Sequence, residues 1–313
     1  MSQLFLEILG LVAGLAILIV GADLLVRGAA QLARVLGLSP FAIGVTVVAF
    51  GTSAPELFAS IGAALLDVEE LAIGNVVGSN IANILLILGA GAIIAPIGIH
   101  RRVRLVELPI MLVITGLTVG LLLDSKLTRV DGALLAAGLI GNVVFIVRSH
   151  RVEIEHEGDE VVTHPKSAWL DVGMVVLGIV ALGLGARALV FGATGVALRV
   201  GVSEGIVGTT VVALGTSLPE LAATIRSVMA KQSDIAVGNV VGSNIFNLLS
   251  VLGITAMIHP LVASPSMEMH LWIMLSVSVL MVVFAMIRPA MGRLVGMCFL
   301  LLYGAYIAFA FVV

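Results

Sequence analysis

Apolar residues fill this chain in ten long stretches that are separated by short polar segments. The stretches cover residues 4–26, 41–66, 71–95, 104–123, 130–148, 168–190, 204–230, 235–258, 270–288 and 293–312. Each holds about 20 residues, the length that a helix needs to cross the hydrocarbon core of a bilayer. The pattern therefore predicts an all-α membrane protein with ten transmembrane helices, five in each half of the chain.

A polar sequence, AFGTSAPE, interrupts the second apolar stretch from Ala49 to Glu56. Pro55 lacks a backbone donor, so we expect a broken helix at the middle of the membrane. The break frees backbone carbonyl groups that lipid cannot satisfy, and a carboxylate at mid-span is costly unless a partner neutralises it. A bound cation, coordinated by Glu56, by the hydroxyl groups and by the freed carbonyls, satisfies both requirements.

The same polar sequence returns 164 residues later as ALGTSLPE, from Ala213 to Glu220. Residues 46–59 and 210–223 are identical at 11 of 14 positions. GNVVGSNIAN from Gly74 and GNVVGSNIFN from Gly238 keep the offset and are identical at 9 of 10 positions. The chain is therefore an internal duplication, with broken helices 2 and 7. Because five spans is an odd number, we expect two inverted repeats, as in many secondary transporters.

The third and eighth stretches carry polar side chains at a spacing of four residues. These side chains are Asn75, Ser79 and Asn83 in the third stretch, and Asn239, Ser243 and Asn247 in the eighth. Residues four apart lie on one helical face, so each set predicts a polar stripe that faces the bundle interior. The alternative is that they only bond helix to helix. We expect that packing role for Asn75 and Asn239, and we assign no role to Asn80 and Asn244.

Two pairs of glycines accompany these stripes. Gly74 and Gly78 lie one turn apart in the third stretch, and Gly238 and Gly242 do so in the eighth. Small residues at this spacing let two helices approach closely. We therefore expect a close helix contact at each pair.

The basic residues between the stretches are distributed unevenly. Twelve of the 16 Lys and Arg residues fall in one set of alternate loops, and four (Lys126, Arg129, Arg187 and Arg199) fall in the other. Basic loops tend to stay in the cytoplasm, so the first set is predicted to be cytoplasmic. Both termini of a protein in the plasma (inner) membrane then lie outside, and the two polar breaks cross the membrane in opposite directions.

Composition agrees with a membrane protein: 60% of the 313 residues are hydrophobic, 11% are charged, and the mean hydropathy is +1.21. A net charge of −3 gives no reason to expect a nucleic-acid partner. The single cysteine, Cys298, excludes a disulfide framework. The first residues lack a basic n-region and are expected to form a membrane helix rather than a cleaved signal. No Walker-type phosphate loop is present, which argues against ATP-driven transport.

We divide the chain into a first repeat (1–148), a cytoplasmic linker (149–167) and a second, inverted repeat (168–313). Three histidines of the linker, His150, His156 and His164, lie among acidic residues. This group could bind a metal ion peripherally, but a solvated linker is the favoured interpretation.

The ligands of the central site narrow the choice of ion. Carboxylate, hydroxyl, amide and carbonyl oxygens suit hard cations such as Ca²⁺, whereas Zn²⁺ and copper prefer the His and Cys side chains that this region lacks. The carboxylates of Glu56 and Glu220 neutralise one divalent ion, or they hold two or more Na⁺ ions. If one divalent ion and several Na⁺ ions compete for the same carboxylate pair, the result is an antiport mechanism. No chemical bond changes, so the protein is not expected to be an enzyme and needs no cofactor.

The doubled motifs, GTSAPE with GNVVGSNIAN and GTSLPE with GNVVGSNIFN, resemble the two α-repeats of the sodium/calcium exchanger family. The resemblance covers nearly the whole chain, because the prokaryotic members of that family also have ten helices in two inverted halves. It implies exchange of Ca²⁺ for Na⁺ across a lipid bilayer. We infer no obligatory protein partner.

The resemblance also implies a role for each residue of the two motifs. Glu56 and Glu220 are the central ligands that Ca²⁺ and Na⁺ share, and Thr52 and Thr216 offer backbone carbonyls to Ca²⁺. Ala49, Ser53 and Ser79 join Glu56 in one flanking Na⁺ site, and Ala213, Ser217, Ser243 and Thr216 join Glu220 in the other. Asn83 lies at the centre.

Asn247, the partner of Asn83, departs from the family pattern, because many members have Asp there. With two full negative charges, the site is neutral with one Ca²⁺ and carries +1 with three Na⁺, which predicts electrogenic exchange if the family's excess of Na⁺ holds. The missing Asp argues against a K⁺ co-site. Proton coupling on the same fold is the main alternative, and a cation channel or a membrane scaffold without transport are further ones.

Overall fold

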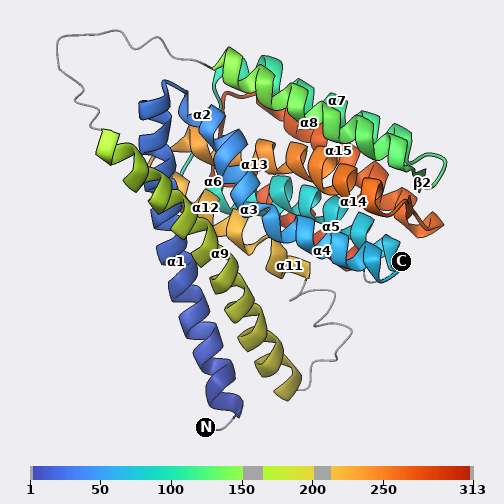
Figure 1. The fold of residues 1–313 in the computed structure, drawn as a ribbon, viewed down its shortest axis with the longest axis horizontal. Coiled ribbons are helices and arrows are strands. Elements are labelled where there is room, and N and C mark those ends of the chain that lie inside the picture. Colours follow the sequence, from blue (N-terminus) through green and yellow to red (C-terminus); the bar gives the residue numbers. More distant parts are fainter. Residues whose placement is uncertain (1–2, 151–164, 201–212, 311–313) are drawn as a thin grey trace.

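The structure, a computed structural model, describes residues 3–150, 165–200 and 213–310, which form helices joined by short loops (Figure 1). The first-half helices are α1 (Gln3–Leu36), α2 (Pro40–Ile43), α3 (Ala49–Thr52), α4 (Ala54–Leu65), α5 (Glu69–Ala82), α6 (Gly89–Ile94), α7 (Leu108–Leu121) and α8 (Arg129–Ser149). The second-half helices are α9 (Pro165–Arg199), α11 (Ala213–Thr216), α12 (Leu218–Met229), α13 (Ser233–Phe246), α14 (Leu252–Ile258), α15 (Pro265–Ile287) and α16 (Arg293–Ala310). Four π-helical segments, η1 (Gly44–Val48), η2 (Asn83–Leu88), η3 (Val103–Glu107) and η5 (Asn247–Val251), continue neighbouring helices.

The chain is an all-helical, multi-pass membrane protein. Among the described residues, eight helices are long and apolar enough to cross a membrane, or nine if the bent pair 40–52 and 54–65 forms one span. The expected span 204–230 begins in 201–212, outside the described residues.

Two helices are longer than their apolar stretches predict. α1 and α9 lie side by side and project beyond the rest of the bundle (Figure 1), reaching Leu36 and Arg199 rather than residues 26 and 190. The first of these two predicted spans ended just before Arg27, and the second ended nine residues before Arg199. Those charges are paired within the structure, because Asp23 bonds Arg27 one turn away at 3.0 Å and Glu7 binds Arg199. Polar residues with partners therefore extend both helices.

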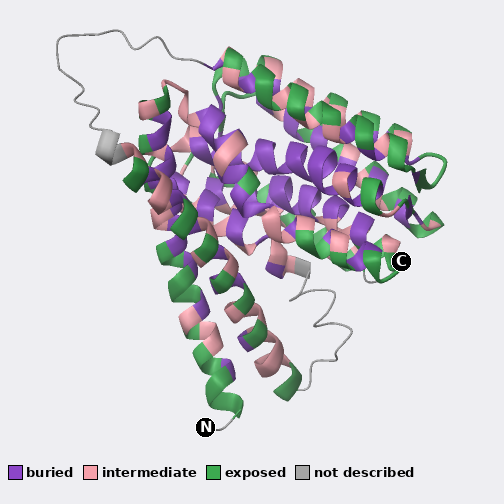
Figure 2. Cartoon of the chain, viewed as in Figure 1, coloured by how far each residue is buried: buried purple, intermediate pink, exposed green. Residues whose placement is uncertain are grey.

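The central layer consists of α5–η2–α6 and α13–η5–α14. In their most apolar windows 72% and 83% of residues are buried, against 17–44% for the other candidate spans. Figure 2 shows this buried centre surrounded by helices with exposed outer faces. The two predicted polar stripes thus lie on the most enclosed helices of the molecule.

Two short antiparallel strand pairs tie loops of the two halves together. β1 (Ile97–Gly98) pairs with β4 (Ala290–Met291), and β2 (Lys126–Leu127) pairs with β3 (Leu261–Val262). The offset of 164 relates β1 to β3 and β2 to β4. The duplication therefore extends from the motifs to the loops.

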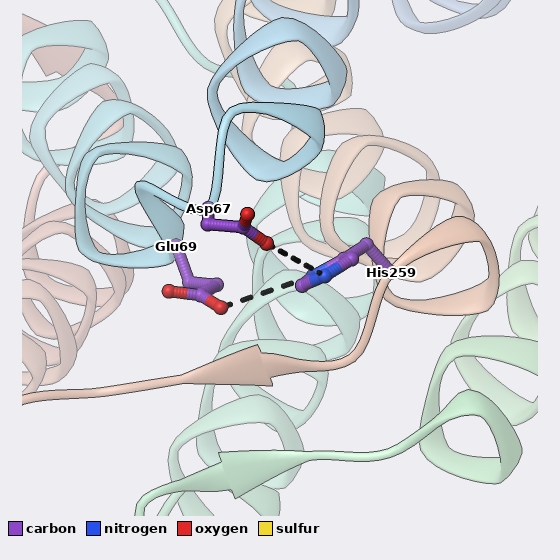
Figure 3. Close-up of side chains that lie close together, drawn as sticks. All are labelled: Asp67, Glu69 and His259. Atoms are coloured by element: carbon purple, nitrogen blue, oxygen red, sulfur yellow. Dashed lines mark ion pairs between the residues drawn. The ribbon is translucent and has the colours of Figure 1, made fainter.

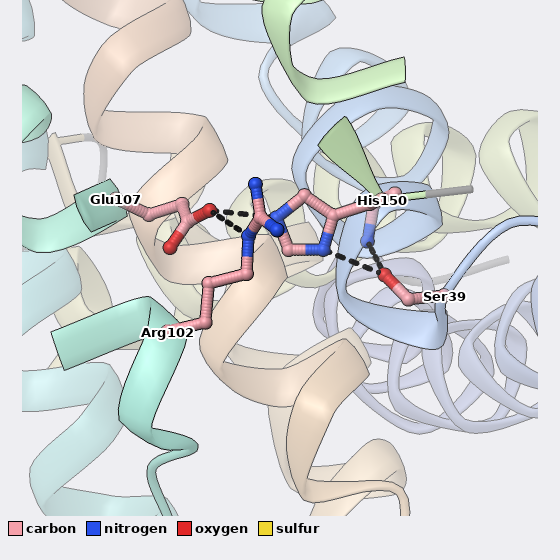
Figure 4. Close-up of polar contacts among 5 residues, drawn as sticks. Ser39, Arg102, Glu107 and His150 are labelled. Atoms are coloured by element: carbon pink, nitrogen blue, oxygen red, sulfur yellow. Dashed lines mark hydrogen bonds and ion pairs between the residues drawn. The ribbon is translucent and has the colours of Figure 1, made fainter. Parts of the chain in front are cut away.

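His150 lies at a buried junction rather than in a solvated linker, which corrects the prediction for that residue. Its Nε2 is 2.6 Å from Glu107 Oε1, and its Nδ1 is 3.0 Å from Ser39 Oγ (Figure 4). Arg102 also donates to Glu107, at 3.2 Å. The sequence pattern missed this contact because 43 residues separate His150 from Glu107. The remaining linker histidines, in 151–164, lie outside the described residues.

Candidate cation site

Ser53 interrupts the second span between α3 and α4, and the two parts are bent by 43°. Pro55 has no N–H, so it cannot donate the helical i→i−4 hydrogen bond to the Gly51 carbonyl. The Glu56 N–H does not bond the Thr52 carbonyl either, since the ladder resumes only one residue later. The break therefore leaves backbone carbonyl groups outside the helical ladder, close in sequence to the buried Glu56.

The second copy of the motif has the same break at Ser217, between α11 and α12. Its backbone angles (φ −87°, ψ 3°) match those of Ser53 (φ −87°, ψ 4°). Ser53 Oγ donates to Glu220 Oε1 at 2.8 Å, and Ser217 Oγ donates to Ser79 Oγ at 3.3 Å. Glu220, like Glu56, is buried. The hydroxyl of one break thus reaches the carboxylate of the other, and the two breaks meet.

Asn75 braces the first break from the side of α5. Its Nδ2 donates to the Glu56 carbonyl at 3.2 Å and to Ser60 Oγ at 2.9 Å. Its Oδ1 accepts a long bond, 3.5 Å, from Thr216 Oγ1. Asn75 therefore links both breaks and has the packing role that the sequence predicts.

Asn239 makes the equivalent contacts in the second half. Its Nδ2 donates to the Glu220 carbonyl at 3.3 Å and to Thr224 Oγ1 at 3.0 Å. Its Oδ1 accepts from Thr52 Oγ1 at 3.2 Å. The hydroxyl of each threonine thus donates to the asparagine of the other half of the chain, Thr52 to Asn239 and Thr216 to Asn75.

Four asparagines of α5, η2, α13 and η5 form a second symmetric arrangement. Asn83 Nδ2 donates to Asn244 Oδ1 at 3.1 Å, and Asn247 Nδ2 donates to Asn80 Oδ1 at 3.2 Å. The amide nitrogens of Asn83 and Asn247 are each engaged in this way, whereas their Oδ1 atoms have no hydrogen-bond partner. The sequence missed the role of Asn80 and Asn244. Their identity in both repeats is the signal that points to them.

The oxygen atoms that lack partners gather in this region. In the described part of the chain, ten buried side-chain nitrogen or oxygen atoms have no hydrogen-bond partner. Six of them belong to predicted site residues: Glu56 Oε1 and Oε2, Glu220 Oε2, Asn83 Oδ1, Asn247 Oδ1 and Ser243 Oγ. Burying unpaired oxygens is costly, and two of the residues are carboxylates. A set made only of oxygens, with up to two negative charges, suits a hard cation.

The other predicted residues lie on the same elements. Ala49 is buried, and its carbonyl accepts from the Ser53 N–H at 2.9 Å and from Thr52 Oγ1 at 3.4 Å. Ser243 is buried on α13. Ala213 is the first residue of α11, and Thr216 is the last. Their roles as ion ligands stay predictions.

Comparisons with known proteins give a consistent result over the whole length. The model of the family described as sodium/calcium exchanger protein matches residues 6–148 and 170–312. Inner membrane protein YrbG of Escherichia coli (strain K12) is 39% identical over 307 residues, which cover 95% of this chain and 93% of that protein. Sodium/calcium exchanger MaX1 of Methanosarcina acetivorans is 30% identical, over 96% of this chain and 97% of that protein. The solved structure of the sodium-calcium exchanger NCX_Mj superposes with a TM-score of 0.88 at 31% identity, covering 98% of this chain and 99% of that one.

Proposed function

Because the chain belongs to the sodium/calcium exchanger family, we propose that it is a secondary antiporter that exchanges Ca²⁺ for Na⁺ by alternating access. The observation that carries this proposal is the set of six buried oxygens without partners on the predicted site residues Glu56, Glu220, Asn83, Asn247 and Ser243. Two of the similar proteins, MaX1 and NCX_Mj, have names that state sodium/calcium exchange. The protein is a transporter, and transport changes no chemical bond.

The proposed ligand set follows the pseudo-symmetry of the two breaks. Glu56 and Glu220 bind both kinds of ion, with the carbonyls of Thr52 and Thr216 added for Ca²⁺. One flanking Na⁺ site uses Glu56, Ala49, Ser53 and Ser79, and the other uses Glu220, Ala213, Ser217, Ser243 and Thr216. Asn83 and Asn247 offer amide oxygens at the centre. The hydrogen bond from Ser53 to Glu220 supports this reading, because it brings groups of both proposed Na⁺ sites together.

Charge balance makes the proposed exchange electrogenic. The two carboxylates give a neutral site with one Ca²⁺ and a charge of +1 with three Na⁺. Asn247 adds no charge, so the site lacks the extra carboxylate that a K⁺ site would need. Proton coupling is the second candidate, since two buried carboxylates can also carry protons.

The topology proposed for this function is ten spans in two inverted repeats, 1–148 and 168–313, with both termini outside and the linker 149–167 in the cytoplasm. The strand pairs support it, because β1–β4 and β2–β3 each join loops that the topology places on one side of the membrane. Inversion gives each repeat a broken helix that enters the midplane from the opposite side.

The deciding experiment is Ca²⁺ uptake into proteoliposomes loaded with Na⁺ at fixed pH. Wild-type protein is expected to take up Ca²⁺ only when internal Na⁺ is present, and uptake is expected to vanish in Glu56→Gln and in Glu220→Gln. A K⁺ diffusion potential across the membrane, imposed with either polarity, should change the rate of Ca²⁺ uptake if the exchange moves net charge. Uptake driven by a pH gradient and indifferent to Na⁺ would establish proton coupling instead. A Ca²⁺ current without any counter-ion would establish a channel.

A further inference from the structure

A second group of potential metal ligands lies where helices end in loops. It is at the opposite end of α4 from Glu56. Asp67 lies in the turn between α4 and α5, Glu69 begins α5, and His259 directly follows α14. Figure 3 shows both carboxylates turned toward the imidazole ring. One ligand atom from each residue lies within 4.8 Å of the other two. Residues from both halves of the chain therefore converge on one point.

The imidazole of His259 has the orientation of a metal ligand. Its Nδ1 lies 3.0 Å from the carbonyl oxygen of Pro260. A carbonyl only accepts, so Nδ1 carries a proton, and in the form of the ring that binds a metal Nε2 carries none. Nε2 then presents its lone pair to Asp67 Oδ1, 3.4 Å away. Metal-bound histidines commonly donate the other ring N–H to a backbone carbonyl in this way, and a cation between Nε2 and Asp67 turns a repulsive contact into an attractive one.

The charge of the group also calls for a cation. Within the described residues, the ion-pair contacts of Asp67 and Glu69 are with His259 alone: Asp67 Oδ1 lies 3.4 Å from Nε2, and Glu69 Oε1 lies 3.9 Å from Nδ1. Arg129 donates instead to the carbonyl of Ile258, at 3.4 Å. With a neutral imidazole the three side chains carry −2, which one divalent ion balances.

We propose that Asp67, Glu69 and His259 form a site for a divalent transition-metal ion, with Zn²⁺ as its representative. One imidazole and two carboxylates are ligands that Zn²⁺ accepts, whereas Ca²⁺ and Mg²⁺ prefer oxygen alone. The side chain of Asp67 is 84% exposed, so the ion enters from solvent and water completes its coordination. The site is separate from the all-oxygen set around Glu56 and Glu220.

The test is a calorimetric titration of the purified full-length protein with Zn²⁺, in excess Ca²⁺ so that the carboxylates of the transport site are engaged. Wild type is expected to bind Zn²⁺ at a site that His259→Gln weakens by about tenfold or more. Asp67→Asn is expected to weaken it as well. Asn tolerates the left-handed backbone at this position (φ 57°), so that variant should fold. The unfolding temperature without Zn²⁺ checks that both variants are intact.

Two further variants locate the site. His100→Gln is the matched control, because His100 faces the single acid Asp234, at 3.2 Å, and is expected to leave Zn²⁺ binding unchanged. Joint replacement of His156 and His164 removes the linker histidines other than the buried His150 and is also expected to leave Zn²⁺ binding unchanged. The proposal is overturned if His259→Gln binds Zn²⁺ as wild type does, or if binding is lost only with the linker histidines.

Discussion

Four asparagines at the centre of the molecule divide into two proposed ligands, Asn83 and Asn247, and two residues that hold them, Asn80 and Asn244. Asn244 Oδ1 accepts the Nδ2 of Asn83, and Asn80 Oδ1 accepts that of Asn247. Asn244 and Asn80 therefore fix the orientation of the neighbouring amides. Because the nitrogen of each neighbouring amide is held, its oxygen points away from the hydrogen bond. In metal sites, such outer contacts commonly change affinity or activity by about 10- to 100-fold.

Asn244→Ala is therefore expected to lower the rate of Ca²⁺ uptake at low Ca²⁺ by about tenfold, although Asn244 is outside the proposed ligand set. The measurement is initial Na⁺-driven uptake against Ca²⁺ concentration in proteoliposomes. Ser278→Ala is the control, because Ser278 is also buried but its hydroxyl bonds only its own helix, at Met274 O. Equal uptake by Asn244→Ala and wild type would show that Asn83 needs no support.

Glu107 is a buried acid that we expect to stabilise the folded protein. It is 1% exposed and binds both His150 and Arg102. Glu107→Gln keeps the shape but removes the charge, and breaking a buried pair in this way is expected to cost about 3 kcal/mol of unfolding free energy. Thermal unfolding in detergent measures the loss. Glu268→Gln, at an exposed acid that contacts Trp272, is expected to change little. Similar unfolding temperatures for the two variants would contradict the prediction.

Single residues show what a sequence can and cannot predict here. Glu56 and Glu220 were found because a carboxylate at mid-span needs a partner, whatever the tertiary structure. Asn80 and Asn244 were passed over because the spacing of four places them off the polar stripe, and only the packing of α5 against α13 brings them to Asn83 and Asn247. The Glu107–His150 contact likewise depends on how distant helices pack.

Glycines control how closely α13 approaches the segment before the first break. A Cβ on Gly238 would lie 2.6 Å from the Phe41 carbonyl oxygen, and one on Gly242 would lie 2.5 Å from that of Val45. The predicted close contact therefore occurs at this pair. At Gly74 a Cβ would meet only Met267, at 3.4 Å, so the described residues show no equivalent contact for the first-half pair.

Gly242→Ala is expected to push η1 away from α13 and to lower Ca²⁺ uptake by about tenfold or more, because η1 leads directly into the broken helix. Overpacking should also cost about 1–3 kcal/mol of stability. Gly304→Ala on α16 is the matched control, since its Cβ meets no atom within 4 Å. Uptake and unfolding temperature are measured for both variants, and normal behaviour of Gly242→Ala would mean that this contact is adaptable.

Element boundaries were predicted less well than the elements themselves. Every predicted span overlaps a described helix, and eight or nine candidate spans are found among the described residues. Apolar length thus indicated where helices lie. It did not locate the ends of α1 and α9, where paired charges let the helix continue, nor the π-helical segments that begin at Asn83 and Asn247. Such segments often mark functional sites, and here they start at two proposed ligands.

At the scale of the whole molecule, the duplication predicts on which side of the membrane equivalent loops lie. Positions 164 residues apart are structurally equivalent, as β1 with β3 and β2 with β4 illustrate. If the repeats are inverted, equivalent positions must face opposite sides of the bilayer. If the repeats were parallel, equivalent positions would face the same side.

Lys126 and Ala290 provide a matched pair for this test, because both are exposed, begin two-residue strands and differ by the repeat offset. We expect Lys126→Cys to react with an impermeant thiol reagent from outside the cell. Ala290→Cys should react only after the cytoplasmic side is opened. Both are made in a Cys298→Ser background, which removes the single native thiol. Replacing Lys126 takes a basic residue from the less basic side, so it strengthens rather than weakens the charge bias that sets orientation. Labelling of both positions from one side would contradict inverted repeats, and with them a shared midplane site that each half enters from its own face.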